Sequence, residues 1–296
     1  MRKNRSRLIA LTILLVILFF GLMIKNNLPR LLPKQPPAVF PQLKKEAVLR
    51  MVITDDGKII NLYKKNGDWF LKKEADEFKA DEEMINQIIN GLASFRKGEI
   101  VSNNKNRYKD FGIGGKKISL TAESKNYVLF VGETAGENLI YLRVDGQNEV
   151  FLGEGFVDIF NQQDFRDLNV NLINNENNLN QIEINFGNNK TNLTKKGNHW
   201  YLSNNLEAKK DRVDFFINDL KTLKGNDVLS EPQIQRPSLI KTVFIRVKEG
   251  STEKTADFFP KDEENYYIKT SSSSFIFQIP AVSVASFKKE AKDFTD

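Results

Sequence analysis

Apolar and polar residues alternate along most of the chain, in short runs separated by Gly, Asn or Asp. Alternation with a period of two predicts β-strands that bury one face, and the small polar residues between the runs are typical of tight turns. Beyond residue 115 this pattern predicts strands at 117–122, 127–131, 140–144 and 149–152, and again at 243–247, 252–259, 266–270 and 275–279.

Two stretches of the chain, 52–71 and 182–202, follow the same pattern. Each has two alternating runs, a Lys-Lys pair, a Gly/Asn turn, and then Trp, an aromatic residue and Leu. Trp69 and Trp200 are 131 positions apart, and the Lys-Lys pairs share this offset. We therefore expect an internal repeat in which each copy begins with a three-stranded meander.

A helical pattern follows each meander. Apolar residues at i, i+3, i+4 and i+7 spacing extend over 84–95 and over 213–223, which predicts two amphipathic helices. Asp81 and Asp211 stand just before them and are the expected N-caps, since a carboxylate can accept hydrogen bonds from the free N–H groups of a first turn.

Shorter amphipathic segments at 156–165 and 282–294 end the two copies. The expected unit is β3-α-β4-α with antiparallel connections. The fold class predicted from the sequence is therefore α+β, with an N-terminal transmembrane helix followed by two tandem antiparallel-sheet-plus-helix repeats. The predicted divisions are a cytoplasmic tail and anchor at 1–27, a Pro-rich spacer at 28–44, a first repeat at 45–168 and a second at 169–296.

The transmembrane prediction rests on residues 8–24, which carry no charge. A helix of that length covers roughly 25 Å, close to the ~30 Å thickness of the bilayer hydrocarbon. Four basic residues precede the run, so the positive-inside rule places the N-terminus in the cytoplasm and the chain after residue 25 outside. The expected location is the cytoplasmic (inner) membrane of a bacterium, with residues 8–24 in the lipid. A cleaved signal peptide is the alternative, which bulky residues after the run disfavour.

Charge is unevenly distributed. The net charge is +6, but residues 1–44 hold eight Lys or Arg and no acid, so the remainder is nearly neutral. A nucleic-acid surface needs clustered basic residues, and we expect no nucleic-acid partner. The chain has no Cys and one His, which excludes disulfide frameworks, zinc fingers and cysteine nucleophiles.

Candidate catalytic residues lack the partners that their chemistry requires. His199 precedes Trp200 on a predicted strand, so it should face solvent if the Trp faces the core. The pairs Ser102/Lys105 and Ser286/Lys289 match Ser-x-x-Lys, but no Lys-Thr-Gly element accompanies them.

The glycines at 112–115 lack the spacing of a phosphate-binding loop and predict a turn. Trp69 and Trp200 are expected in the core, with a sugar-stacking platform as the alternative. We expect no catalytic, cofactor-binding or metal-ligating residues and no cofactor.

Several motifs together resemble a bacterial family of unknown function. They are the Gly-x-Trp-x-Leu pattern at 67–71 with its counterpart near Trp200, the pair Ala80-Asp81, and Tyr108-x-x-Phe111-Gly112-Ile113 before a strand pair. The likeness covers roughly residues 48–290, and it departs in the second copy at 237–239, where Pro-Ser-Leu stands. The resemblance implies an accessory protein of a gliding-motility-type or uncharacterised ABC transport system.

These observations favour a non-catalytic, membrane-anchored extracytoplasmic binding or scaffold protein with protein partners in the cell envelope. One alternative is an envelope enzyme that acts on glycan or peptide through carboxylates or a Ser-Lys pair. Another is a purely structural spacer.

Overall fold

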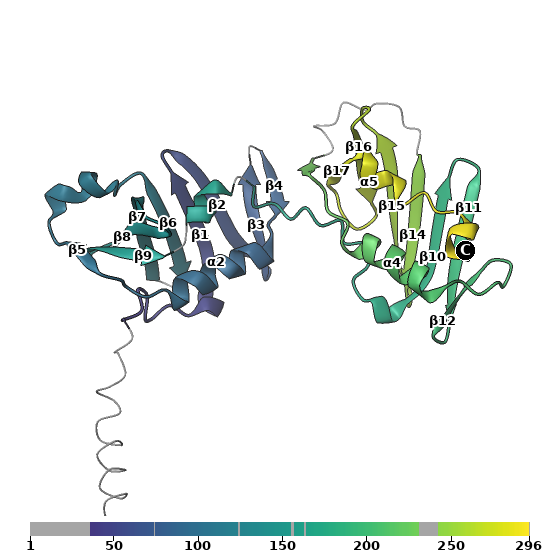
Figure 1. The fold of residues 1–296 in the computed structure, drawn as a ribbon, viewed down its shortest axis with the longest axis horizontal. Coiled ribbons are helices and arrows are strands. Elements are labelled where there is room, and N and C mark those ends of the chain that lie inside the picture. Colours follow the sequence, from purple (N-terminus) through teal and green to yellow (C-terminus); the bar gives the residue numbers. More distant parts are fainter. Residues whose placement is uncertain are drawn as a thin grey trace, which may run out of the picture. The chain divides into compact units, whose positions relative to one another are not determined.

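Two antiparallel sheets, of nine and eight strands, dominate the structure (Figure 1). The computed structural model describes residues 36–73, 75–123, 125–154, 157–162, 164–230 and 242–295. The fold is mostly β, so the predicted α+β class with β3-α-β4-α repeats is wrong. Short helical turns replace the second helix expected in each copy.

The first sheet has the strand order β4-β3-β2-β1-β6-β7-β8-β9-β5. Its strands are β1 (Val48–Asp55), β2 (Lys58–Lys65), β3 (Asp68–Lys73), β4 (Asp76–Lys79), β5 (Ile100–Ser102), β6 (Lys116–Ala122), β7 (Lys125–Gly136), β8 (Leu139–Val144) and β9 (Val150–Glu154).

The second sheet has the order β12-β11-β10-β14-β15-β16-β17-β13. This order matches that of the first sheet strand for strand, once β4 is set aside. Its strands are β10 (Leu179–Phe186), β11 (Asn189–Lys196), β12 (His199–Leu202), β13 (Asp227–Leu229), β14 (Val243–Glu249), β15 (Thr252–Pro260), β16 (Asn265–Thr270) and β17 (Ile276–Pro280).

Strand pairing repeats the 131-residue offset found in the sequence. Trp69 pairs with Lys64 in the first sheet, and Trp200 pairs with Lys195 in the second. Both Trp side chains are buried, with 0% and 4% of their surface exposed, and each pairing Lys Nζ lies within 6 Å of the indole ring centre. The expectation that both Trp belong to the core is confirmed.

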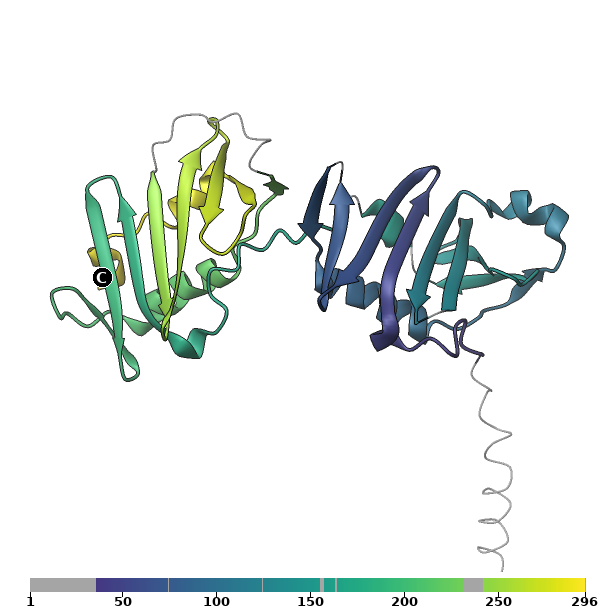
Figure 2. The ribbon, with the colours of Figure 1, turned by 180° about the vertical axis from the view of Figure 1, so that it is seen from behind.

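One longer helix lies against one face of each sheet (Figures 1 and 2). They are α2 (Glu82–Ser94) and α4 (Lys210–Lys221). Asp81 caps α2 as expected, because its Oδ1 accepts the N–H of Met84 at 3.0 Å. Asp211 is not a cap but lies inside the first turn of α4, because that helix already begins at Lys210, next to a main-chain hydrogen bond from Lys209 to Phe294 (2.8 Å).

The remaining helices are short, and this is why the predicted class fails. Helices α3 (Val157–Asn161) and α5 (Ala281–Ala285) have five residues each. The amphipathic segment 282–294 is divided between α5 and a 3-10 turn, Ala291–Phe294, and the buried Phe287 lies between them. Further 3-10 turns are Lys45–Ala47, Lys105–Phe111 and Glu176–Asn178.

The expected transmembrane helix and signal anchor at 8–24 fall outside the described residues, as do the Pro-Ser-Leu residues at 237–239. Within the part of the chain that the structure describes, no helix is long and apolar enough to cross a membrane. No described helix therefore corresponds to the predicted transmembrane helix. At the described end of the Pro-rich segment, Val39 and Phe40 are buried, so these residues pack into the fold.

The chain divides into two compact units. The first unit combines described residues up to Val48 with Ile53–Lys58 and Ile89–Asp158. The second combines Leu49–Val52, Ile59–Ile88 and the chain from Ile159 onward. The second unit thus contains β2 from Ile59 onward, β3 and β4, together with the whole eight-stranded sheet. The predicted domain boundaries stay a prediction.

A tyrosine on β2 makes a hydrogen bond whose contribution to stability should depend on pH. Tyr63 donates a hydrogen bond to Glu77 on β4, and Lys65 pairs with the other oxygen of Glu77 at 2.7 Å. Burial and the bond to Glu77 raise the pKa of Tyr63 to about 12.

At neutral pH we expect Tyr63→Phe to lower the free energy of unfolding by about 1 kcal/mol, the usual value of one hydrogen bond. Between pH ~10 and ~12 the unfolded Tyr63 releases its proton while the folded one keeps it, so the wild type loses more stability there than Tyr63→Phe, and the difference between the two proteins shrinks. Urea unfolding at pH 8 and pH 11 measures this. Tyr127→Phe is the control, because its hydroxyl donates to the main-chain oxygen of Gln42 (3.1 Å) and not to a carboxylate. Equal pH slopes for wild type and Tyr63→Phe would contradict the expectation.

Candidate ligand-binding site

A chain segment after the first sheet, 164–171, builds one wall of the candidate site. Main-chain hydrogen bonds fix it on two sides: the N–H of Asp167 donates to the carbonyl of Lys79 (2.8 Å), and the N–H of Val170 donates to the carbonyl of Leu223 (3.0 Å). All of these residues belong to the second unit. The segment is therefore held in one position, although it has no regular secondary structure.

Arg166 anchors this segment. Its side chain is 7% exposed, and its Nε lies 2.9 Å from both carboxylate oxygens of Asp164. Its Nη2 lies 2.7 Å from Oδ1 of Asp227, its Nη1 donates to the carbonyl of Val228, and the guanidinium lies 5.3 Å from the ring centre of Phe78. Two carboxylates thus compensate this buried cation.

The electrostatics of the pair keep both partners charged. Burial opposes ionisation of Asp164 and is its largest single influence, but the hydrogen bonds from Arg166 outweigh it, so the pKa of Asp164 lies below its usual value. The hydrogen bond to Asp164 raises the pKa of Arg166. A carboxylate held ionised in this way is a poor general acid.

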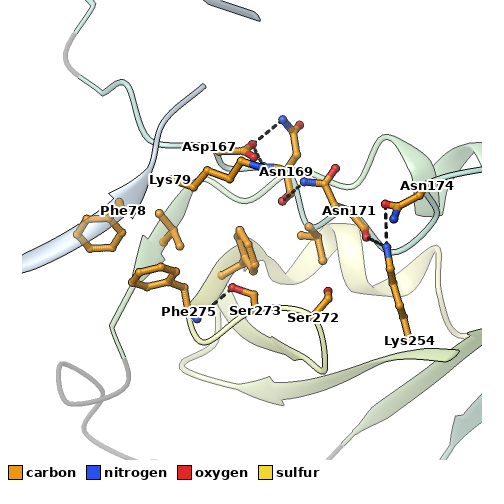
Figure 3. A pocket seen from close by; sticks show the side chains of 13 residues that line it. Phe78, Lys79, Asp167, Asn169, Asn171, Asn174, Lys254, Ser272, Ser273 and Phe275 are labelled. Carbon is orange, nitrogen blue, oxygen red and sulfur yellow. Dashed lines mark hydrogen bonds between the residues drawn. The ribbon is translucent and has the colours of Figure 1, made fainter. Parts of the chain in front are cut away.

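Beside this anchor lies a cavity of about 460 Å³, which we call the Lys254 cavity (Figure 3). Small-molecule sites in proteins typically measure ~300–1,000 Å³. Figure 3 shows Phe78 and Phe275 at one end of the lining and Asn174 and Lys254 at the other. The apolar residues are Phe78, Val170, Val228, Phe275 and Phe277, and the polar ones are Lys79, Asp167, Asn169, Asn171, Asn174, Lys254, Ser272 and Ser273.

Lys254 supplies the buried charge of this cavity. The side chain comes from β15, and the residue is 8% exposed. Its ammonium donates to the main-chain oxygen of Asn171 at 2.7 Å and to Oδ1 of Asn174 at 2.8 Å (Figure 3). Burial lowers the pKa of Lys254, and the nearby Glu249 partly offsets this effect.

A second cavity, of about 720 Å³, lies in the first unit around the segment after α2. Its least exposed cation is Lys97, which is already bound by Oε2 of Glu149 at 2.7 Å and by Oε1 of Gln147 at 2.5 Å. Because that charge is satisfied within the protein, the Lys254 cavity is the better candidate for binding a ligand.

The candidate catalytic residues considered in the sequence analysis do not line the Lys254 cavity. His199 is exposed, as expected, and its Nδ1 lies 2.6 Å from Oε1 of Glu207. The hydroxyl of Ser102 accepts the N–H of Asn104 (3.2 Å), and that of Ser286 donates to the carbonyl of Ser283 (2.9 Å). Both hydroxyls therefore serve local turns.

The other expectations concern the glycines and metals. Gly112 ends the 3-10 turn Lys105–Phe111 with a φ of 66°, so the expected turn at 112–115 is found. Among the residues that the structure describes, no group of three or more His, Asp or Glu is arranged to hold a metal ion.

Sequence reasoning missed the Lys254 cavity, although one signal was present. Lys254 occupies the same phase of its strand as the buried Ala256 and Phe258. A lysine on the inward face of an alternating strand is unusual, since charged side chains are rarely buried without a partner. Arg166 carried no comparable signal, because it lies in a segment without periodicity.

The fold and the cavity together define a mostly β protein with two sheets of matching strand order and a ligand-sized polar cavity. The chain belongs to the family described as Domain of unknown function (DUF4340), whose model matches residues 69–240, more than half of the chain. The search of curated proteins and the search of solved structures each returned no match.

Proposed function

We propose that the chain is a binding protein of the bacterial cell envelope that captures a small ligand without transforming it. The observation that carries the proposal is Lys254, a buried cation in a ligand-sized cavity, held by neutral groups. Charge of this kind is costly to bury and is usually retained for a specific interaction.

The class of partner comes from the resemblance described in the sequence analysis. Accessory proteins of gliding-motility-type or uncharacterised ABC transport systems act beside a permease and an ATPase. We therefore propose that the chain serves such a complex from the outer side of the cytoplasmic membrane. The near-neutral charge of residues 45–296 and the lack of cysteine are compatible with that location.

The enzyme alternative gains no support from the carboxylates. Among the described residues, the carboxylates with a shifted pKa are Glu77, Asp164, Glu183 and Asp262, and each shift is downward. Glycan hydrolysis by paired carboxylates needs one member with a raised pKa that can donate a proton. The alternative stays a prediction that the present geometry does not favour.

Crosslinking in intact cells tests the location and the partner together. A membrane-impermeant amine-reactive crosslinker should join the full-length chain to a transport permease or its ATPase-bound complex, identified by mass spectrometry after stringent purification. Exposed lysines such as Lys105 and Lys288 supply the reactive amines. A chain that reacts only after the cells are lysed, or that is recovered alone at its native abundance, would contradict the proposal.

A further inference from the structure

Among the described residues, Lys254 and Arg166 are the buried cations, and Lys254 differs from Arg166 in having no carboxylate partner. An ammonium group offers three N–H donors, and two of them are used by Asn171 and Asn174. Among the described residues, no Asp or Glu lies within ion-pair distance of its Nζ. By contrast, Arg166 is compensated by two aspartates and Lys97 by Glu149. The remaining donor, and a positive charge that only the more distant Glu249 offsets, suit an anionic group of a ligand.

The amide side chains of the wall present both acceptors and donors. Asn169 donates through its Nδ2 to Asp167 (2.7 Å), and Asn171 donates through its Nδ2 to the main-chain oxygen of Asn169 (3.1 Å), which leaves each side-chain oxygen available. Asn174 uses its oxygen on Lys254, which leaves its NH₂. Adjacent acceptors and donors of this kind match hydroxyl groups, each of which donates one hydrogen bond and accepts others.

The opposite end of the cavity is apolar. Phe275 stacks on Phe78 with ring centres 4.9 Å apart and planes inclined by 27°. Figure 3 shows both rings at the end away from Lys254, with Ser273 next to Phe275. The aromatic rings can pack against the C–H groups on one face of a ligand, and the amide side chains can bind hydroxyl groups along its edge.

We propose that the Lys254 cavity binds a small polyhydroxylated anion, a sugar acid or sugar phosphate. Its anionic group contacts Lys254, its hydroxyls contact the amides of Asn169, Asn171 and Asn174, and its apolar face lies toward Phe275. This inference rests on the proposed function as a ligand-capturing protein and adds the chemical class of the ligand.

Calorimetric titration of the full-length chain with four probes tests the inference. The probes are glucuronate, glucose 6-phosphate, glucose and inorganic phosphate. We expect at least one charged sugar to bind about tenfold or more tightly than glucose and than inorganic phosphate, because only the charged sugars satisfy both ends of the cavity. The tighter of glucuronate and glucose 6-phosphate identifies the anionic group as a carboxylate or a phosphate.

Two variants assign the contacts. Lys254→Met should reduce the affinity for the charged sugar to that for glucose, whereas Lys248→Met, on the neighbouring strand β14 and outside the cavity lining, should leave it unchanged. If Lys254→Met does not fold, Asn169→Ala provides the second test. It should weaken sugar binding while the protein stays folded, because the main chain keeps its bond to Asp167 (3.0 Å).

Three results would overturn the inference. They are equal affinity for glucose and the charged sugars, inorganic phosphate binding as tightly as the charged sugars, and no binding of any probe up to about 10 mM. The crosslinking experiment is independent: a charged sugar that binds to a chain recovered without a transport complex would support the ligand class and contradict the accessory role.

Discussion

Replacing Arg166 with methionine is expected to lower the free energy of unfolding of the second unit by about 3–5 kcal/mol, because removing one partner leaves buried charges uncompensated. Asp164 and Asp227 both contact the guanidinium, and the carbonyl of Val228 accepts a further bond. Urea unfolding of the wild type and the variant at pH 7 measures the loss.

Two controls separate lost charge pairing from lost packing. A triple variant, Arg166→Met with Asp164→Asn and Asp227→Asn, should recover much of the loss because no unpaired charge remains. Lowering the pH is the second control, and it should reduce the difference in free energy of unfolding between the wild type and Arg166→Met. In the wild type the pKa of Asp164 is lowered, so its contribution is present above about pH 3.9 and is lost below. Without Arg166, the effect of burial is no longer offset, so the pKa of Asp164 lies higher in the variant and the carboxyl is neutralised sooner as the pH falls. A triple variant as unstable as Arg166→Met would show that packing alone is responsible.

Trp69→Ala is expected to cost about 3–5 kcal/mol, the usual loss when a large buried aromatic side chain is truncated. Trp69 has no exposed surface, and it pairs across to Lys64 in the first meander. Trp200→Ala should cost a similar amount, since Trp200 holds the equivalent place in the second meander. Thermal or urea unfolding, followed by the fluorescence of the remaining Trp, measures both variants.

Trp69→Phe is the matched control. The indole Nε1 of Trp69 is buried and has no hydrogen-bond acceptor among the described residues. An unpaired buried donor costs about 1–3 kcal/mol, so phenylalanine loses volume but also removes this penalty, and a net change under about 1.5 kcal/mol is expected. A loss as large as that of Trp69→Ala would mean that the indole nitrogen has a favourable interaction.

Strands and turns could be predicted because the pattern that specifies them is local. Alternation in 252–259 is enough to place β15, and the 131-residue offset between Trp69 and Trp200 reappears as an identical pairing register. The fold class could not be predicted as safely. A short amphipathic window such as 282–294 has helical spacing, yet its apolar residues Phe287 and Phe294 are buried from short turns.

The Lys254 cavity depends on contacts that no local pattern contains. Phe78 and Phe275 stack although they are nearly two hundred positions apart. One partner of Arg166 is local and the other is not. Asp164 is two residues away and could be predicted from the sequence, whereas Asp227 comes close to Arg166 only through the fold. Strands of three residues, such as β5 and β13, are also too short to show a period.

The short edge strands of the two sheets have one further consequence. These are β4 and β5 in the first sheet and β12 and β13 in the second, and each has only three or four residues. Long bare edges let separate molecules add strand to strand and grow into fibres. Edges this short offer an incoming strand few main-chain partners, so the chain is protected against polymerising through its sheets even where it is crowded.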